Sequence, residues 1–499
     1  MFKQLTRSGK ILGLLGATAM FATACSGAAA TPSATTAPST APTTAPTAAP
    51  TGTPIIITPA PIAQGPGPNG GTVVEWFIGL GAGTQPAQIG PEQAFAAKFN
   101  ASQKDVYLQL DIVDNTQAAN ILKTRIAANN APDIIGPVGV EGLNIFRDQL
   151  QDLAPTIAKD NYTFAGVDQS LVDFFKLGNN GATVGVPFAV YPSFIYYNKA
   201  LFKEAGLPNL PTKVGDTYQG KPWDLDNLTA TAEKLTVDKA GKDATQAGFD
   251  PNNIVQWGFD GQYEDNSARA EDAFFGAGSF LATDGKTAQI PDYVVAGEKW
   301  FNDGVWKNHF IPTAAQVNSA LLGAGGEFGS GNLAMNWSHT WFTCCVAPPT
   351  GKKQFDFGFA VMPTVNGKIT SPLHADTFSV LKSSKNLDKA WTALKAMVAS
   401  SDLLTTYGAM PANKNLWKTW EASINKGFPG ITLDWSVPEA MLAYPDVPNH
   451  QSWMPNYTKA KAALQAFQNK YRTTSGLNMD TEFATLKTTL QGIFNEPQS

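Results

Sequence analysis

Strands and helices alternate along the chain from Thr72 onward, as its hydrophobic and polar positions indicate. The segments Thr72 to Ile78 (TVVEWFI) and Val106 to Val113 (VYLQLDIV) are rich in β-branched and aromatic residues, which favour strands. Between them, Pro91 suits the first position of a helix that continues to Asn100. The pattern therefore begins as strand, helix, strand.

The alternation continues through a second helix and a third strand. Thr116 suits the cap of a helix. The core-facing stripe of this helix comprises Ile121, Leu122, Arg125 and Ile126. The segment Ala131 to Ile135 (APDII) then predicts the third strand. Strands and helices at this spacing predict an α/β fold with a doubly wound parallel sheet.

The stretch Gly185 to Leu207 (GVPFAVYPSFIYYNKALFKEAGL) organises the rest of the chain. It predicts a strand that ends at Gly-Val-Pro, followed by a loop that carries Phe188 and Tyr191. A second strand is expected from Phe194 to Asn198, and then a short helix that stops where Gly is followed by Pro.

This stretch resembles the crossing point between the two lobes of bacterial ABC-transporter solute-binding proteins of family 1, most of which capture sugars. Other segments are similar to the family in the same order, and together they cover nearly all of residues 72–413. They are LKTRIAANNAPDII (122–135), LNIFRDQLQDLAP (143–155), LATDGKTAQ (281–289), EFGSGNLAMNW (327–337), FDFGFAVMP (355–363), the segment 377–400 and YGAMPAN (407–413).

The resemblance implies a two-lobed α/β fold of the periplasmic-binding-protein type. Each lobe would hold a mixed or parallel sheet flanked by helices, with the ligand cleft between the lobes. It implies one lobe from 71–189 plus 373–412 and another from 190–372 plus 413–499. A monomer would close on a sugar or oligosaccharide by a hinge motion and deliver it to an ABC import permease, without a cofactor.

The first 70 residues lie outside this globular region. Residues 1–24 place Lys3, Arg7 and Lys10 before a short apolar run and small residues, which is typical of a secretory signal. Cys25 then resembles a bacterial lipoprotein cleavage site, although Ala22 stands where that pattern usually has Leu. Residues 25–70 are dominated by Ala, Thr and Pro and are expected to form a disordered linker. We therefore expect a lipid-anchored protein on the outer face of the bacterial cytoplasmic membrane.

The charge and the motifs of the sequence argue against several classes of partner and activity. Without the signal, 33 basic residues stand against 41 acidic ones, a formal charge of −8, which argues against nucleic acid and against an anionic membrane surface. No motif of a zinc protease, phosphate-binding loop or serine hydrolase occurs, and the four His residues are too dispersed to indicate a metal site. We therefore predict a binding protein rather than an enzyme, although two suitably spaced carboxylates would suffice for a glycosidase.

Ligand contacts are expected on loops that follow the strands, because open α/β sheets bind ligands at the carboxyl ends of their strands. Sugar sites combine stacking rings with planar hydrogen-bonding groups. After the first strand, Trp76 and Gln85 are candidates, although Trp76 fits core packing equally well. Asn115 and Glu141 follow the next two strands and suit either hydroxyl binding or a helix cap.

Further candidates follow the crossing. Tyr191 lies between two prolines in the crossing loop, and Trp257 and Tyr263 flank a glycine-containing turn; Trp257 also fits the core. By position in the family, ligand contacts are implied in Trp337-Ser-His339-Thr-Trp341 and in His374-Ala-Asp376, the latter pair suiting either specificity or a hinge salt bridge. Trp453 belongs to a late Pro-rich loop that could close over the cleft. The set after the crossing is Tyr191, Trp257, Tyr263, Trp337, His339, Trp341, His374, Asp376 and Trp453.

Cys344 and Cys345 are adjacent, and they are the only cysteines other than Cys25. Outside the cytoplasm such a pair fits either a strained vicinal disulfide beside Trp341 or two buried thiols. Two rival functions also remain open. One is a non-sugar solute such as a polyol, opine or peptide on the same fold, and the other is a secreted carbohydrate-active enzyme.

Overall fold

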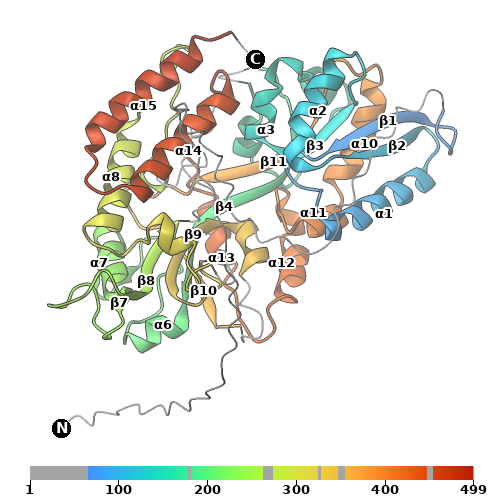
Figure 1. The fold of residues 1–499 in the computed structure, drawn as a ribbon. Coiled ribbons are helices and arrows are strands. Elements are labelled where there is room, and N and C mark those ends of the chain that lie inside the picture. The colour runs from blue at the N-terminus through green and yellow to red at the C-terminus, as the bar shows by residue number, and fades with distance from the viewer. Residues whose placement is uncertain are drawn as a thin grey trace, which may run out of the picture. The chain divides into compact units, whose positions relative to one another are not determined.

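A single long strand, β4 (Val186–Asn198), runs through the middle of the sheet in the computed structural model (Figure 1). The structure describes residues 66–177, 181–261, 273–323, 327–346, 354–446 and 453–497, without the side chains of 344 and 345. All of them belong to the unit Ile56–Ser499. Cys25, the signal and most of the linker lie outside the described residues.

The described strands form one ten-stranded mixed sheet and a separate two-stranded one. The order along the larger sheet is β2-β1-β3-β11-β4-β9-β8-β7, and β10 and β12 also pair with β4. The remaining strands are β1 (Thr72–Ile78), β2 (Val106–Ile112), β3 (Ile134–Gly139), β5 (Thr217–Tyr218), β6 (Lys221–Pro222), β7 (Val237–Asp238), β8 (Ile254–Gly261), β9 (Leu333–His339), β10 (Phe357–Ala360), β11 (Leu373–Val380) and β12 (Met410–Pro411).

Helices flank this sheet, with α1, α2 and α10 beside β1–β3 and with α7 and α8 near β8 in Figure 1. Their bounds are α1 (Pro86–Ser102), α2 (Asn115–Ala127), α3 (Val140–Ile145), α4 (Ala154–Lys159), α5 (Gln169–Phe174), α6 (Lys199–Glu204), α7 (Leu225–Leu235), α8 (Asp292–Trp306), α9 (Ala314–Val317), α10 (Leu387–Val398), α11 (Ser401–Tyr407), α12 (Trp417–Asn425), α13 (Ser436–Met441), α14 (Tyr457–Thr473) and α15 (Met479–Phe494). Short 3-10 turns include η5 (Thr340–Cys345).

The parallel pairing of β1 with β2 and with β3 agrees with the alternation of the sequence. The loops that follow these three strands therefore emerge at the same edge of the sheet. Beyond them, β11 returns antiparallel to both β3 and β4, which places a late segment of the chain next to the first strands.

The prediction of two strands separated by a loop between Gly185 and Asn198 is wrong, because β4 is continuous. Its first half pairs with β11 as far as Pro192 opposite Leu373, and its second half pairs with β9 from Ser193 onward. Pro192 lacks an N–H, which would normally interrupt a central strand. Pro192 is tolerated because it lies at the position where the pairing of β4 with β11 ends and its pairing with β9 begins.

Two helix starts also differ from the prediction. The first helix begins at Pro86 rather than Pro91, because Gln85 and Gln88 form a reciprocal cap there. Asp114, not Thr116, caps α2 by accepting a hydrogen bond from the Thr116 N–H. In each helix the cap lies a few residues before the predicted one.

Candidate functional site

A cavity of about 440 Å³ opens where the first three strands end. The loop after β1 contributes Leu80 to Ala82, the start of α2 contributes Asn115, and the end of β3 and α3 contribute Gly139 and Glu141. The opposite side is formed by β4, β11, η5, α11 and α14. The full set of lining residues is Leu80, Gly81, Ala82, Asn115, Ala119, Gly139, Glu141, Gly142, Ile145, Tyr191, Trp341, His374, Ala375, Asp376, Tyr407 and Lys461.

Aromatic rings form one wall of this cleft. Trp341 is half-buried, and its ring centroid lies 5.3 Å from that of Tyr191. On another side Trp341 stacks on His339, with centroids 4.1 Å apart and planes 21° apart. The ring centroid of His374 lies 5.0 Å from that of Trp341. Packing fixes the Trp341 ring, so a ligand in the cleft would meet an already oriented aromatic surface.

Polar groups stand beside these rings. The hydroxyl of Tyr191 donates a hydrogen bond of 3.2 Å to Asp376 Oδ2. Burial, together with the neighbouring Asp376 carboxylate, raises the pKa of Tyr191 well above its usual value, so Tyr191 keeps its proton at neutral pH. His374 and Asp376 are two residues apart on β11 and therefore share one face of the strand. The Nδ2 of Asn115 donates to the carbonyl of Gly79 at 2.8 Å and so anchors the loop after β1.

A second wall joins α3 to the C-terminal segment. Glu141 and Lys461 form an ion pair, and their side chains are about a quarter exposed. Nearby, Asn144 Nδ2 donates to the carbonyl of Met454 at 3.3 Å. Arg147 donates to the carbonyl of Trp453 at 3.1 Å. These contacts connect the element that follows β3 with the start of α14.

Below the cleft, Tyr407 donates a hydrogen bond of 2.7 Å to Glu92 Oε1. Glu92 belongs to α1 and its side chain is fully buried. Burial raises the pKa of Glu92 to about 8, an effect that the hydrogen bond from Tyr407 partly offsets. The pKa of Tyr407 is also raised, first by burial and then by the Glu92 carboxylate.

The structure brings together six of the residues predicted from the sequence to contact a ligand. They are Asn115, Glu141, Tyr191, Trp341, His374 and Asp376. His339 lies directly behind this set, buried against Trp341.

Other predicted residues lie elsewhere. Trp76, Trp257 and Trp337 are fully buried in the core, each on a strand. Trp76 packs edge-on against Phe378 on the α1 side of the sheet, and Trp337 packs against Phe274. Gln85 caps α1, and Trp453 is half-buried beside Arg147 instead of lining the cavity. Tyr263 and the side chains of Cys344 and Cys345 lie outside the described residues.

The sequence reasoning missed Tyr407 and Lys461. Tyr407 begins the YGAMPAN segment, which resembles the family but has no local pattern that indicates a ligand contact at its first position. Lys461 lies on α14 among several lysines, and no local pattern distinguishes it from Lys459 or Lys470. Only the packing of α14 against α3 places it at the cleft.

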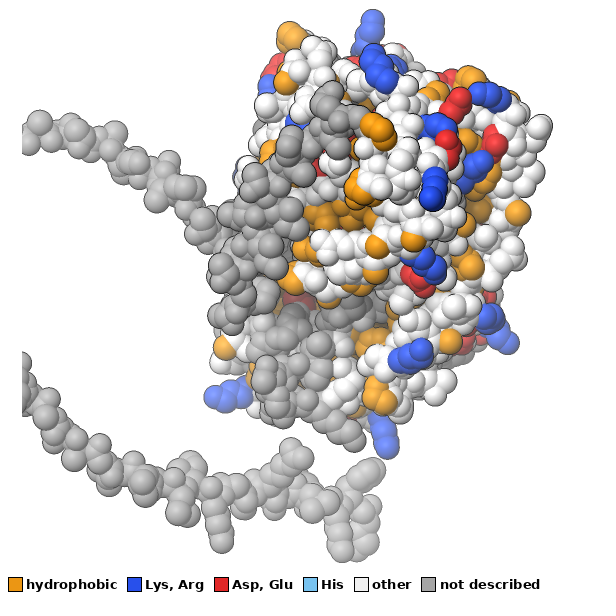
Figure 2. All heavy atoms as spheres, turned by 90° about the vertical axis from the view of Figure 1, so that its right-hand side faces the viewer, with side chains coloured by type: hydrophobic (Ala, Val, Ile, Leu, Met, Phe, Trp, Pro, Cys, Tyr) orange, Lys and Arg blue, Asp and Glu red, His pale blue; other side chains and the backbone are white. Residues whose placement is uncertain are grey.

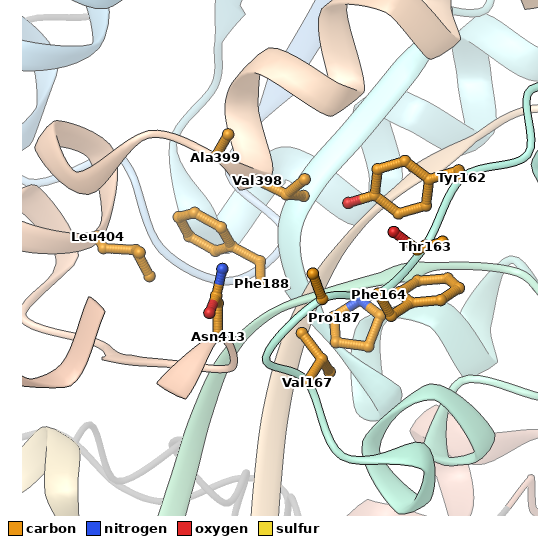
Figure 3. Close-up of a pocket in the computed structure, with 11 residues that line it drawn as sticks. Tyr162, Thr163, Phe164, Val167, Pro187, Phe188, Val398, Ala399, Leu404 and Asn413 are labelled. Atoms are coloured by element: carbon orange, nitrogen blue, oxygen red, sulfur yellow. The ribbon is translucent and has the colours of Figure 1, made fainter. Parts of the chain in front are cut away.

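A second cavity of about 140 Å³ lies between the loop 162–167, β4 and the helices α10 and α11. Figure 3 shows the rings of Tyr162, Phe164 and Phe188 around it, with Asn413 as one of few polar groups. It is therefore much smaller than the cleft of about 440 Å³. None of the predicted site residues lines it.

Charge is not concentrated on the face of the molecule shown in Figure 2, where Lys and Arg side chains are spread among uncharged ones. Within the described ranges, no group of His, Cys, Asp and Glu side chains is arranged to hold a metal ion. In the same part of the chain, no helix has both the length and the apolar character that crossing a membrane requires.

The fold and the cleft define a two-lobed binding protein of the periplasmic type, with a mixed α/β sheet. The family of bacterial extracellular solute-binding proteins matches residues 82–402, and the chain belongs to this family. A search of curated proteins found no significant match.

Solved structures with the same fold cover most of the chain at low sequence identity. UspC of M. tuberculosis is 20% identical, with a TM-score of 0.61 over 84% of this chain and 100% of its own. The cyclic alpha-maltosyl-1,6-maltose binding protein from Arthrobacter globiformis is 18% identical, with a TM-score of 0.61 over 85% of this chain and 99% of its own. The sugar-binding protein MalE from Xanthomonas citri is 16% identical, with a TM-score of 0.62 over 85% and 97%.

Proposed function

We propose that this protein captures a sugar or short oligosaccharide in the cleft and delivers it to an ABC import permease. The observation that carries the proposal is the arrangement of Trp341 and Tyr191 beside Asp376 in one cavity. An aromatic face suits the C–H face of a pyranose, and a carboxylate and an amide suit its hydroxyls. The sugar-binding names of proteins with the same fold support this choice.

The charges of the cleft favour an uncharged solute. Glu141 is paired with Lys461, and Asp376 accepts the hydrogen bond of Tyr191. A charged ligand group would have to compete with these contacts, whereas hydroxyl groups can add to them. A peptide or an opine, which carries a carboxylate, therefore fits this cleft less well than a sugar.

We further propose that capture works by closure of two lobes. One lobe would comprise 71–189 plus 373–412 and the other 190–372 plus 413–499, with β4 and β11 as the crossing strands. Ligand contacts made from both sides would then favour the closed state. The secretory signal of 1–24 would direct export and be removed, and acylation of Cys25 would then hold the monomeric protein at the outer face of the membrane.

Removal of the ion pair between Glu141 and Lys461 at the cleft should weaken binding modestly. We expect Lys461→Met to raise the Kd about threefold to fivefold, because a partly exposed pair contributes up to about 1 kcal/mol to the arrangement in which both walls line the cleft. High salt should raise the Kd of the wild type, because it screens the ion pair, and should leave the Kd of Lys461→Met unchanged.

Lys459→Met is a matched control for this prediction. Lys459 lies on the same helix and pairs with Glu496 away from the cleft. Its loss should leave the Kd unchanged. Equal effects of the two substitutions would mean that the Glu141–Lys461 pair has no special part in closure.

Isothermal titration against a panel of mono- and oligosaccharides tests the proposed function. We expect a saturable heat for at least one sugar, and mass spectrometry should recover that sugar unchanged after incubation. Absence of binding across the panel would overturn the assignment of a sugar. Cleaved product would instead indicate a carbohydrate-active enzyme.

A further inference from the structure

Glu92 is a buried acidic residue that lies behind the wall of the cleft and does not line the cavity itself. Glu92 lies on α1 and is fully buried, and its Oε1 accepts the hydrogen bond of Tyr407, which does line the cleft. Its other oxygen, Oε2, is buried with no hydrogen-bond partner among the described residues. A carboxyl group in such a place costs stability, so its retention needs a reason.

Glu92 also contacts the second element of the same wall. The loop after β1 reaches Gly83, whose φ is +103°, and a Cβ built on Gly83 would lie 2.5 Å from Glu92 Oε1. The backbone N–H of Gly83 is held by Gln88 of α1 at 2.9 Å. Leu80, Gly81 and Ala82 of this loop line the cavity. The Glu92 carboxyl group therefore accepts the hydrogen bond of Tyr407 and also lies directly against Gly83 in the loop after β1.

We propose that Glu92 is a positioning residue for solute capture, whose buried carboxyl holds Tyr407 and the loop after β1 where both line the cleft. The inference rests on the proposed function, since it concerns the same cleft. It assigns Glu92 no contact with the solute. Its role is to fix the shape of the wall that the solute meets.

The protonation state of Glu92 makes this role measurable. With its pKa raised to about 8 by burial, Glu92 is mainly neutral at pH 7 and accepts the Tyr407 hydroxyl without a buried charge. Above that pH the carboxylate must recruit water or turn toward solvent, and either movement disturbs Tyr407 and the loop. A solute that covers Tyr407 excludes water further and so favours the neutral form. Affinity should therefore fall as the pH rises through about 8.

Few other ionisable groups face Glu92. From α11 it meets Tyr407, and beyond that ring lie Asp376 and Tyr191. The loop after β1 contributes no charged residue. The Lys98–Asp402 pair between α1 and α11 is at the surface, with side chains more than 70% exposed.

The remaining charges nearby are turned away from Glu92. The cluster of Glu75, Asp111 and Arg125 joins β1 and β2 to α2, on the face of the sheet opposite α1. On α10, Lys389 pairs with Asp105 and Lys395 with Asp160.

The experiment compares binding of a panel sugar to the wild type, Glu92→Gln and Glu233→Gln at pH 7, 8 and 9. The Kd of the wild type should rise about threefold to tenfold between pH 7 and 9, as expected for one coupled proton. Glu92→Gln retains a neutral acceptor for Tyr407, so its Kd should match the wild type at pH 7 and stay flat. Glu233, whose pKa is also raised by burial, lies on α7 away from the cleft, and its variant should keep the wild-type slope. Parallel slopes in the wild type and Glu92→Gln would overturn the proposal.

A second measurement needs no ligand. Hydrogen exchange at pH 7 should be faster in Glu92→Ala than in the wild type at residues 80–83 and 404–408, and unchanged in Glu92→Gln. If no sugar binds the wild type but this difference appears, the proposed function fails while the positioning role stands. Unchanged exchange in Glu92→Ala would overturn the positioning role itself.

Discussion

Replacement of Trp341 by alanine is expected to weaken sugar binding by at least about thirtyfold, close to 2 kcal/mol. The reason is that its half-buried ring is the large aromatic surface at the cavity, already oriented by His339 and Tyr191. Loss of a pre-oriented stacking face removes contact area and leaves the remaining rings free to reorient. Isothermal titration with the best panel sugar measures the change.

Phe342→Ala provides a matched control from the next position of the same turn. Phe342 is also half-buried, but it packs against the core, where its ring centroid lies 5.3 Å from that of Tyr196, and it does not line the cleft. Its removal should lower the unfolding free energy by about 2–4 kcal/mol while binding at low temperature stays within about threefold of the wild type. Trp341→Ala should show the reverse, with a small stability change and a large loss of affinity. Equal losses of affinity in both variants would mean that Trp341 acts only by supporting the fold.

These expectations depend on a fold that the sequence predicted in large part. The first three strands, the helices between them and the late return of β11 all follow from local hydrophobic patterns or from likeness to the family. The continuous β4 did not, because local rules take Pro187 and Pro192 as strand breakers. Whether a proline interrupts a strand depends on which partner is beside it, and this pairing involves β9 and β11, both more than 130 residues further along the chain.

The cleft was harder to predict than the fold. Trp337 and Trp341 stand four residues apart in one motif, yet the first is 1% exposed and the second lines the cavity. In the sequence both are aromatic residues near the end of a strand. They differ in exposure because β9 ends at His339, which lies between them. Lys461 reaches the cleft through the packing of α14 on α3, and Glu92 acts through Tyr407 from a different helix. Such contacts between distant segments leave no local pattern.

The helix α14, which carries Lys461, is joined to the sheet by a fully buried ion pair. Arg472 of α14 donates to both carboxylate oxygens of Asp260 at the end of β8, at 2.7 and 3.3 Å, and to the carbonyl of Pro312 at 3.0 Å. Both side chains are 0% exposed. Such a pair adds little net stability compared with apolar packing, but loss of one partner leaves a buried charge.

We therefore expect Arg472→Met to lower the free energy of unfolding by about 3–5 kcal/mol, as measured by urea denaturation. Met fills much of the same space, so the loss should come mainly from the Asp260 carboxylate left without its guanidinium. The double variant Arg472→Met/Asp260→Asn should recover part of that stability, because it also removes the buried carboxylate that has lost its guanidinium. Lys470→Met is the matched control, since Lys470 pairs with Glu482 and is half exposed, and it should cost less than about 1 kcal/mol. If Arg472→Met costs no more than Lys470→Met, the buried pair does not hold α14 on β8, and the position of Lys461 at the cleft must depend on the apolar face of α14 instead.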